Sequence, residues 1–129
     1  MTPELTVLVL AALLQFVQIA VAGAVMNRDV GVEYNAGPRD GKVAFSPLTG
    51  RLRRAVDNHF EALALFTIAA VALALTGKGS SVTAACAWIY LAARIIYVPA
   101  YAYGWSPWRS VIFGVGATAT LVMLLTALF

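Results

Sequence analysis

Four long apolar segments, separated by three polar connections, make up this chain. They run from about residue 5 to 26, 54 to 76, 81 to 103 and 110 to 129. A lipid hydrocarbon core about 30 Å thick needs roughly 20 apolar residues per spanning helix, so each segment is long enough to cross it. The pattern predicts an all-α membrane protein with four transmembrane helices. We interpret residues 1–129 as one integral membrane domain.

The connections differ in length, which predicts how the helices are arranged. The first, residues 27–53, is long and rich in Gly, Pro, Asn and Asp, which are typical of turns. The second and third, residues 77–80 and 104–109, are short. Short connections favour antiparallel neighbours, so we expect an up-down bundle. Residues 31–50 could form a lid over a pocket or an ordinary solvated loop, and we favour the loop.

Composition and charge place the chain in a membrane and predict its orientation. Hydrophobic residues make up 61% and charged residues 12% of the chain, against about half and a quarter in soluble domains. Lysine and arginine gather in the first and third connections, whereas the second carries only Lys78. The positive-inside rule therefore predicts that the long loop is cytoplasmic and both termini lie outside. The net charge of +3 follows from this asymmetry and does not require a nucleic-acid partner.

The sequence gives little support for a disulfide, a metal site or a cleaved signal peptide. With one cysteine and one histidine, the chain can form no intrachain disulfide and has no cluster of metal ligands. The first apolar segment is preceded by Glu4 instead of a basic residue, and it is longer than the apolar core of a signal peptide. We therefore interpret it as a retained helix.

Polar side chains stand at the beginning of the second apolar segment. Arg54, Asn58 and Glu61 are spaced i, i+4 and i+7, so they share one face of a helix. Ionisable groups at the edge of a membrane are costly unless they pair or hold a ligand. This stripe is therefore the first candidate for a functional site.

Two polar neighbours lie outside the stripe. Asp57 is four residues after Arg53, so we expect the two to pair on the helix surface. His59 points about 100° away from Asn58 on a helix. We expect it to face the interface or the cytoplasm and not to act as a catalytic base.

A second stripe runs along the third apolar segment. Arg94 lies about nine residues, or roughly 13 Å, from the end of that segment, a depth at which arginine normally faces the bundle interior. Tyr90, Arg94, Tyr97 and Tyr101 share one helix face, and Arg109 follows at the start of the fourth segment. Because the second connection is so short, we expect this stripe to face the first one.

Two interpretations of the facing stripes remain open. Glu61 and Arg94 could form a structural ion pair that sets the helix register, as buried polar residues often do. Alternatively, the two stripes form a cationic, tyrosine-lined pocket that opens to the cytoplasm. Such a pocket suits a small ligand with several carboxylates, because arginine binds carboxylates through two hydrogen bonds. Asparagine and glutamate would then distinguish amide and amine groups.

The two stripes contain sequence motifs of a known family. The motifs read Arg54-Ala55-x-x-Asn58-x-x-Glu61 and Ala93-Arg94-x-x-Tyr97-x-x-x-Tyr101. With four spans in this order, the chain resembles the MAPEG family, the membrane-associated proteins in eicosanoid and glutathione metabolism. The loop residues 34–40 and 48–50 are similar to a bacterial branch of that family.

The resemblance implies a homotrimer, in the inner membrane of a bacterium, that binds glutathione as co-substrate between subunits near the cytoplasmic face. By position, the glutathione-binding residues would be Arg54, Asn58, Glu61, Arg94, Tyr97 and Tyr101. Arg109 would be catalytic, because a nearby guanidinium favours the thiolate of a thiol whose pKa is otherwise about 8.5. The thiolate would attack a lipophilic electrophile from the bilayer, as in a transferase or peroxidase.

Two other functions compete with this one. A catalytically silent relative would bind glutathione, lipid or a partner protein without turnover. A proton-coupled exporter would carry an acid within the first span, where this chain has only Gln15 and Gln18. We expect these two glutamines to form interhelical hydrogen bonds in a trimer core.

Overall fold

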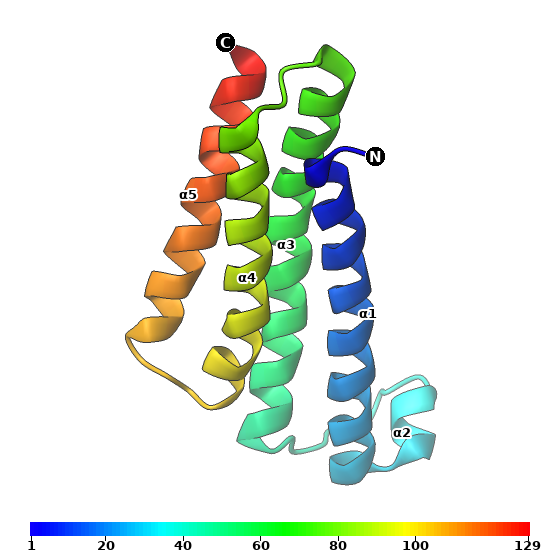
Figure 1. Cartoon of the computed structure of the whole chain (residues 1–129). Helices are drawn as coiled ribbons and strands as arrows, with labels where there is room; N and C mark the ends of the chain where they lie inside the picture. The colour runs from blue at the N-terminus through cyan, green and yellow to red at the C-terminus, as the bar shows by residue number, and fades with distance from the viewer.

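The chain folds into a bundle of four long antiparallel helices with one short helix beside it (Figure 1). The computed structural model describes all residues from 1 to 129. Its helices are α1 (Pro3–Val30), α2 (Val32–Ala36), α3 (Pro47–Thr76), α4 (Ser81–Ala102) and α5 (Trp108–Leu128). All four long helices are long and apolar enough to cross a membrane. The predicted all-α, four-span, up-down architecture is confirmed.

Helix α3 begins earlier than the hydrophobic pattern indicated. Residues 47–53 were expected in the first connection, but they form the first turns of α3. Ser46 caps this helix by accepting a hydrogen bond from the backbone N–H of Thr49, and Pro47 occupies the first turn, where its fixed φ suits a helix. These polar turns continue the membrane helix into the connection.

The long connection is fastened to α1 and lies away from α5. Asp29, near the end of α1, accepts hydrogen bonds from Ser46 N at 2.9 Å, from Ser46 Oγ at 2.8 Å, and from Thr49 Oγ1. Helix α2 packs against α1 alone, through contacts such as Asn35 Nδ2 to Asn27 Oδ1 at 2.6 Å (Figure 1). The α2 part of the connection therefore covers no other helix.

Small side chains line the inside of the bundle, and large apolar ones cover its outside. Four core alanines, at positions 11, 69, 70 and 87, are fully buried between helices. In contrast, large side chains such as Phe16 and Ile68 are more than half exposed. Close approach over small residues is typical of membrane helix packing, and the exposed apolar surface suits contact with lipid.

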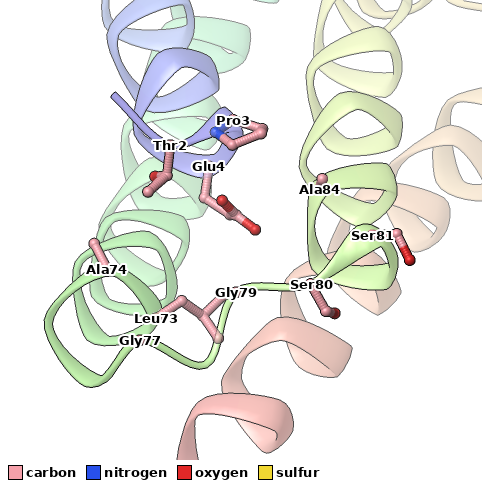
Figure 2. Close-up of a pocket in the computed structure, with 10 residues that line it drawn as sticks. All are labelled: Thr2, Pro3, Glu4, Leu73, Ala74, Gly77, Gly79, Ser80, Ser81 and Ala84. Atoms are coloured by element: carbon pink, nitrogen blue, oxygen red, sulfur yellow. The ribbon is translucent and has the colours of Figure 1, made fainter.

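A buried acid joins the helices at the end where both termini lie (Figure 2). Glu4 is only 2% exposed, and its Oε1 accepts a hydrogen bond from Thr83 Oγ1 at 2.6 Å. It lines a cavity of about 470 Å³ together with Gly79 and Ser80 of the α3–α4 turn. Helices α1 and α4 both begin here, and helix N-termini stabilise a carboxylate. Glu4 therefore ties α1 to the α3–α4 hairpin.

Replacing Glu4 with alanine should lower the free energy of unfolding by about 2 kcal/mol, because it removes a buried hydrogen bond to a charged group. Equilibrium unfolding of the detergent-solubilised protein would measure the change. Glu33→Ala is the matched control, since Glu33 is exposed on α2. Equal stability of the two variants would contradict the assigned role of Glu4.

Candidate functional site

The opposite end of the bundle brings two arginines to one tyrosine. Arg54 on α3 donates from Nε to Tyr101 Oη on α4 at 3.0 Å. The guanidinium carbon of Arg109, on α5, lies 4.7 Å from the centre of the Tyr101 ring, and that of Arg54 lies 5.7 Å from it. Both distances fall within the range of cation–π attraction. The prediction that the two stripes face each other is confirmed here by Arg54 and Tyr101, and Arg109 lies beside them.

Arg94 lies deeper in the bundle, where neutral groups hold its guanidinium. Its Nη1 donates to Asn58 Oδ1 at 2.8 Å and its Nε donates to His59 Nδ1 at 3.2 Å. Its guanidinium carbon lies 4.4 Å from the centre of the Tyr97 ring. The side chain is 2% exposed, and Nη2 has no hydrogen-bond partner.

Arg94 therefore lacks an anionic partner within the chain. Its hydrogen-bond partners are an amide and an imidazole, and neither carries a negative charge. A buried charge without a counterion costs several kcal/mol. An anionic ligand placed beside the guanidinium would offset that cost.

The ion pair between Glu61 and Arg94, one of the two interpretations left open, does not form. Glu61 is exposed, and Asn58 occupies the position beside Arg94 instead. Around the helix axis, Asn58 lies about 40° from Arg54 in one direction, and Glu61 lies about 20° from it in the other. Asn58 therefore turns inward, while Glu61 stays on the exposed side with Arg54. The ion-pair interpretation was therefore wrong. Asp57 is also exposed and does not form the expected ion pair with Arg53.

His59 was expected at the interface or in the cytoplasm, and this expectation was also wrong. Its side chain is fully buried, with Nε2 2.8 Å from the backbone carbonyl oxygen of Ala11 on α1. A carbonyl can only accept, so Nε2 carries the hydrogen and Nδ1 accepts from Arg94. His59 thus connects α1, α3 and α4. The only sign of this role in the sequence was that a polar residue stands one position from the stripe. Spacing along one helix does not show which of its side chains contact a third helix.

The two glutamines of α1 make contacts within the chain. Gln15 Nε2 donates to the Val56 carbonyl oxygen on α3 at 3.1 Å, and Gln18 Nε2 donates to Gln15 Oε1 at 3.4 Å. Gln15 therefore makes an interhelical hydrogen bond within the chain, whereas Gln18 bonds only to Gln15 on its own helix.

Two cavities lie beside α5 and share one wall residue. A polar cavity of about 160 Å³ is lined by Asn58, Tyr97, Arg109, Ser110 and Phe113. An apolar cavity of about 260 Å³ lies between α3, α4 and α5, and Phe113 lines it too. Most of its wall is apolar, but Tyr90, Arg94 and Thr120 also line it. A polar molecule and an apolar molecule could therefore bind next to each other.

Comparison with known proteins gives one match. A sequence model described as MAPEG family matches residues 4–129, nearly the whole chain. No curated protein and no solved structure shows a significant match.

Proposed function

The chain belongs to the MAPEG family, and from that premise we propose that it is a glutathione-dependent transferase or peroxidase in the membrane. The observation that carries the proposal is the buried guanidinium of Arg94, which has no anionic partner in the chain. It lies near the cationic end that contains Arg54 and Arg109. Glutathione, a peptide with two carboxylates, one amine and one thiol, has groups that match these side chains.

The proposed roles in binding follow from the chemistry of each side chain. The glutathione carboxylates would accept hydrogen bonds from Arg54 and Arg94, supported by Asn58, Tyr97 and Tyr101. Glu61 would accept from the amine. Because Glu61 is exposed in the single chain, this role fits a site completed by a neighbouring subunit of the proposed homotrimer.

Arg109 is proposed to stabilise the thiolate. It lines the polar cavity, which shares Phe113 with the apolar cavity between α3, α4 and α5. A guanidinium near sulfur lowers the thiol pKa and so increases the nucleophilic fraction at neutral pH. A lipophilic electrophile entering from the bilayer would occupy the apolar cavity, within reach of the sulfur.

We also propose the orientation and the compartment. The end of the bundle that holds Arg54 and Arg109 adjoins the two connections richest in Lys and Arg, so it would face the cytoplasm of a bacterial cell, across the inner membrane. Glutathione would reach the site from that compartment.

Glutathione should stabilise the detergent-solubilised protein. At 100 times the dissociation constant, it should raise the free energy of unfolding by about 2.7 kcal/mol. Thermal unfolding with and without millimolar glutathione measures this. Arg54→Ala should reduce the shift, whereas Arg28→Ala, an exposed arginine at the end of α1, should not.

Three outcomes separate the candidate functions. An unchanged unfolding temperature of the wild-type chain, together with no thiolate absorbance, would contradict glutathione binding. Stabilisation by glutathione without turnover of any electrophile would identify a silent relative that only binds it. Stabilisation together with turnover supports the proposal.

A further inference from the structure

Tyr90 carries a buried hydroxyl for which the chain offers no partner. Its side chain is 1% exposed, and its Oη makes no hydrogen bond. The ring is held firmly, because it stacks on Phe66 with centroids 4.2 Å apart and planes 13° apart. Leaving a buried hydroxyl unpaired costs free energy that a phenylalanine would avoid. The hydroxyl is thus fixed in place and free to bind another molecule.

Arg94 supplies a second free donor one helical turn away. Its Nε and Nη1 are engaged by His59 and Asn58, and its Nη2 is buried without a partner. Residues four apart on a helix are neighbours on one face. Tyr90 and Arg94 also line the same cavity of about 260 Å³, and its remaining wall is mostly apolar.

We propose that Tyr90 determines specificity in this cavity, because its hydroxyl favours a lipophilic molecule with a hydrogen-bond-accepting oxygen, such as an epoxide, over the same molecule without that oxygen. Tyr90 Oη donates to that oxygen, and one of the two N–H groups of Arg94 Nη2 supports it, which leaves the other for a glutathione carboxylate. The apolar wall holds the rest of the molecule. The binding step needs no glutathione, whereas the chemical step below rests on the proposed function.

The same two donors would assist the reaction. The glutathione sulfur forms a bond to an epoxide carbon, the bond from that carbon to oxygen breaks, and its electron pair stays on the oxygen. The proton released by the thiol ends on this oxygen, so the product is a hydroxy thioether. Donors aimed at an oxygen that gains charge stabilise the transition state more than the ground state.

Tyr90→Phe tests the binding step on the full chain in detergent without glutathione. The probes are styrene oxide and ethylbenzene, which differ in the accepting oxygen. The variant should unfold at or above the wild-type temperature, because it loses no internal hydrogen bond. It should bind ethylbenzene as the wild type does and styrene oxide about tenfold more weakly. Tyr103→Phe is the control, since that tyrosine is exposed in the α4–α5 connection and should change neither affinity.

The chemical step is tested separately with glutathione. Tyr90→Phe should lower kcat/KM for styrene oxide about tenfold while leaving the KM for glutathione unchanged. Benzyl bromide, whose bromide leaving group needs no proton donor, should react at the wild-type rate.

The outcomes distinguish this inference from the proposed function. If the wild-type chain binds neither probe, or if Tyr90→Phe binds both as the wild type does, the inference is overturned. It is equally overturned if the variant is less stable than the wild type, because the hydroxyl then has a structural partner. If glutathione fails to bind but Tyr90 still discriminates between the probes, the proposed function fails and the oxygen site stands.

Discussion

Replacing Arg109 with alanine should lower kcat at neutral pH about 100-fold, the usual loss when one preorganised electrostatic group is removed. Arg109 is the cation on α5 that lines the polar cavity, and Arg54 and Arg94 remain to bind the carboxylates of glutathione. The KM for glutathione should therefore change by only a few-fold. Steady-state kinetics with a soluble electrophile would separate the two parameters.

The pH profile of the Arg109 variant provides a readout that a folding defect would not reproduce. A nearby guanidinium lowers the pKa of the bound thiol, so its removal should return that pKa towards about 8.5. Turnover of the variant should then recover as the pH rises above neutrality, and the thiolate absorbance should shift in parallel. Unchanged kcat together with an unchanged profile would exclude Arg109 as the catalytic residue. Arg28→Ala is again the matched control.

His59→Ala should lower the free energy of unfolding by about 3 kcal/mol, the largest stability effect that we expect from one substitution. The change leaves the Nε of a buried guanidinium without a partner, removes the contact with the Ala11 carbonyl, and opens a cavity between three helices. Equilibrium unfolding in mixed micelles of mild detergent and sodium dodecyl sulfate measures it.

His59→Asn separates the hydrogen bond from the volume of the ring. The asparagine Oδ1 can occupy the place of Nδ1 and accept from Arg94, while the contact with Ala11 is lost. Its stability should therefore lie between those of the wild type and the alanine variant. An alanine variant within about 1 kcal/mol of the wild type would show that His59 does not hold Arg94 in place.

Some of the candidate site was predictable because it depends on spacing within one helix. Arg94 and Tyr97 share a face at i and i+3, and the structure places the Arg94 guanidinium over the Tyr97 ring. The short connection between the second and third spans also predicted that their stripes would face each other. The contacts of Arg54 with Tyr101 and of Asn58 with Arg94 agree with this prediction.

The wrongly predicted residues were those whose surroundings depend on a third helix or on how their own helix is rotated. His59 was expected to face water, but α1 supplies the carbonyl that buries it. One interpretation paired Glu61 with Arg94, but a rotation of a few tens of degrees about the α3 axis leaves Glu61 exposed and brings Asn58 inward. Helical periodicity gives relative angles on one helix and does not tell which angle faces a neighbour.

The sequence by itself determined the class of protein, the four spans, their antiparallel order and the end at which the cationic residues gather. These properties follow from the length of apolar runs, the length of connections and the distribution of charge, which are all local along the chain. Tertiary structure alone decided which polar groups meet inside the bundle. It left Arg94 buried without an anion and Tyr90 without a partner, because hydrogen bonds between helices depend on the rotation and register of each helix. The same dependence makes the unpartnered groups of Arg94 and Tyr90 the most informative features of this molecule for its function.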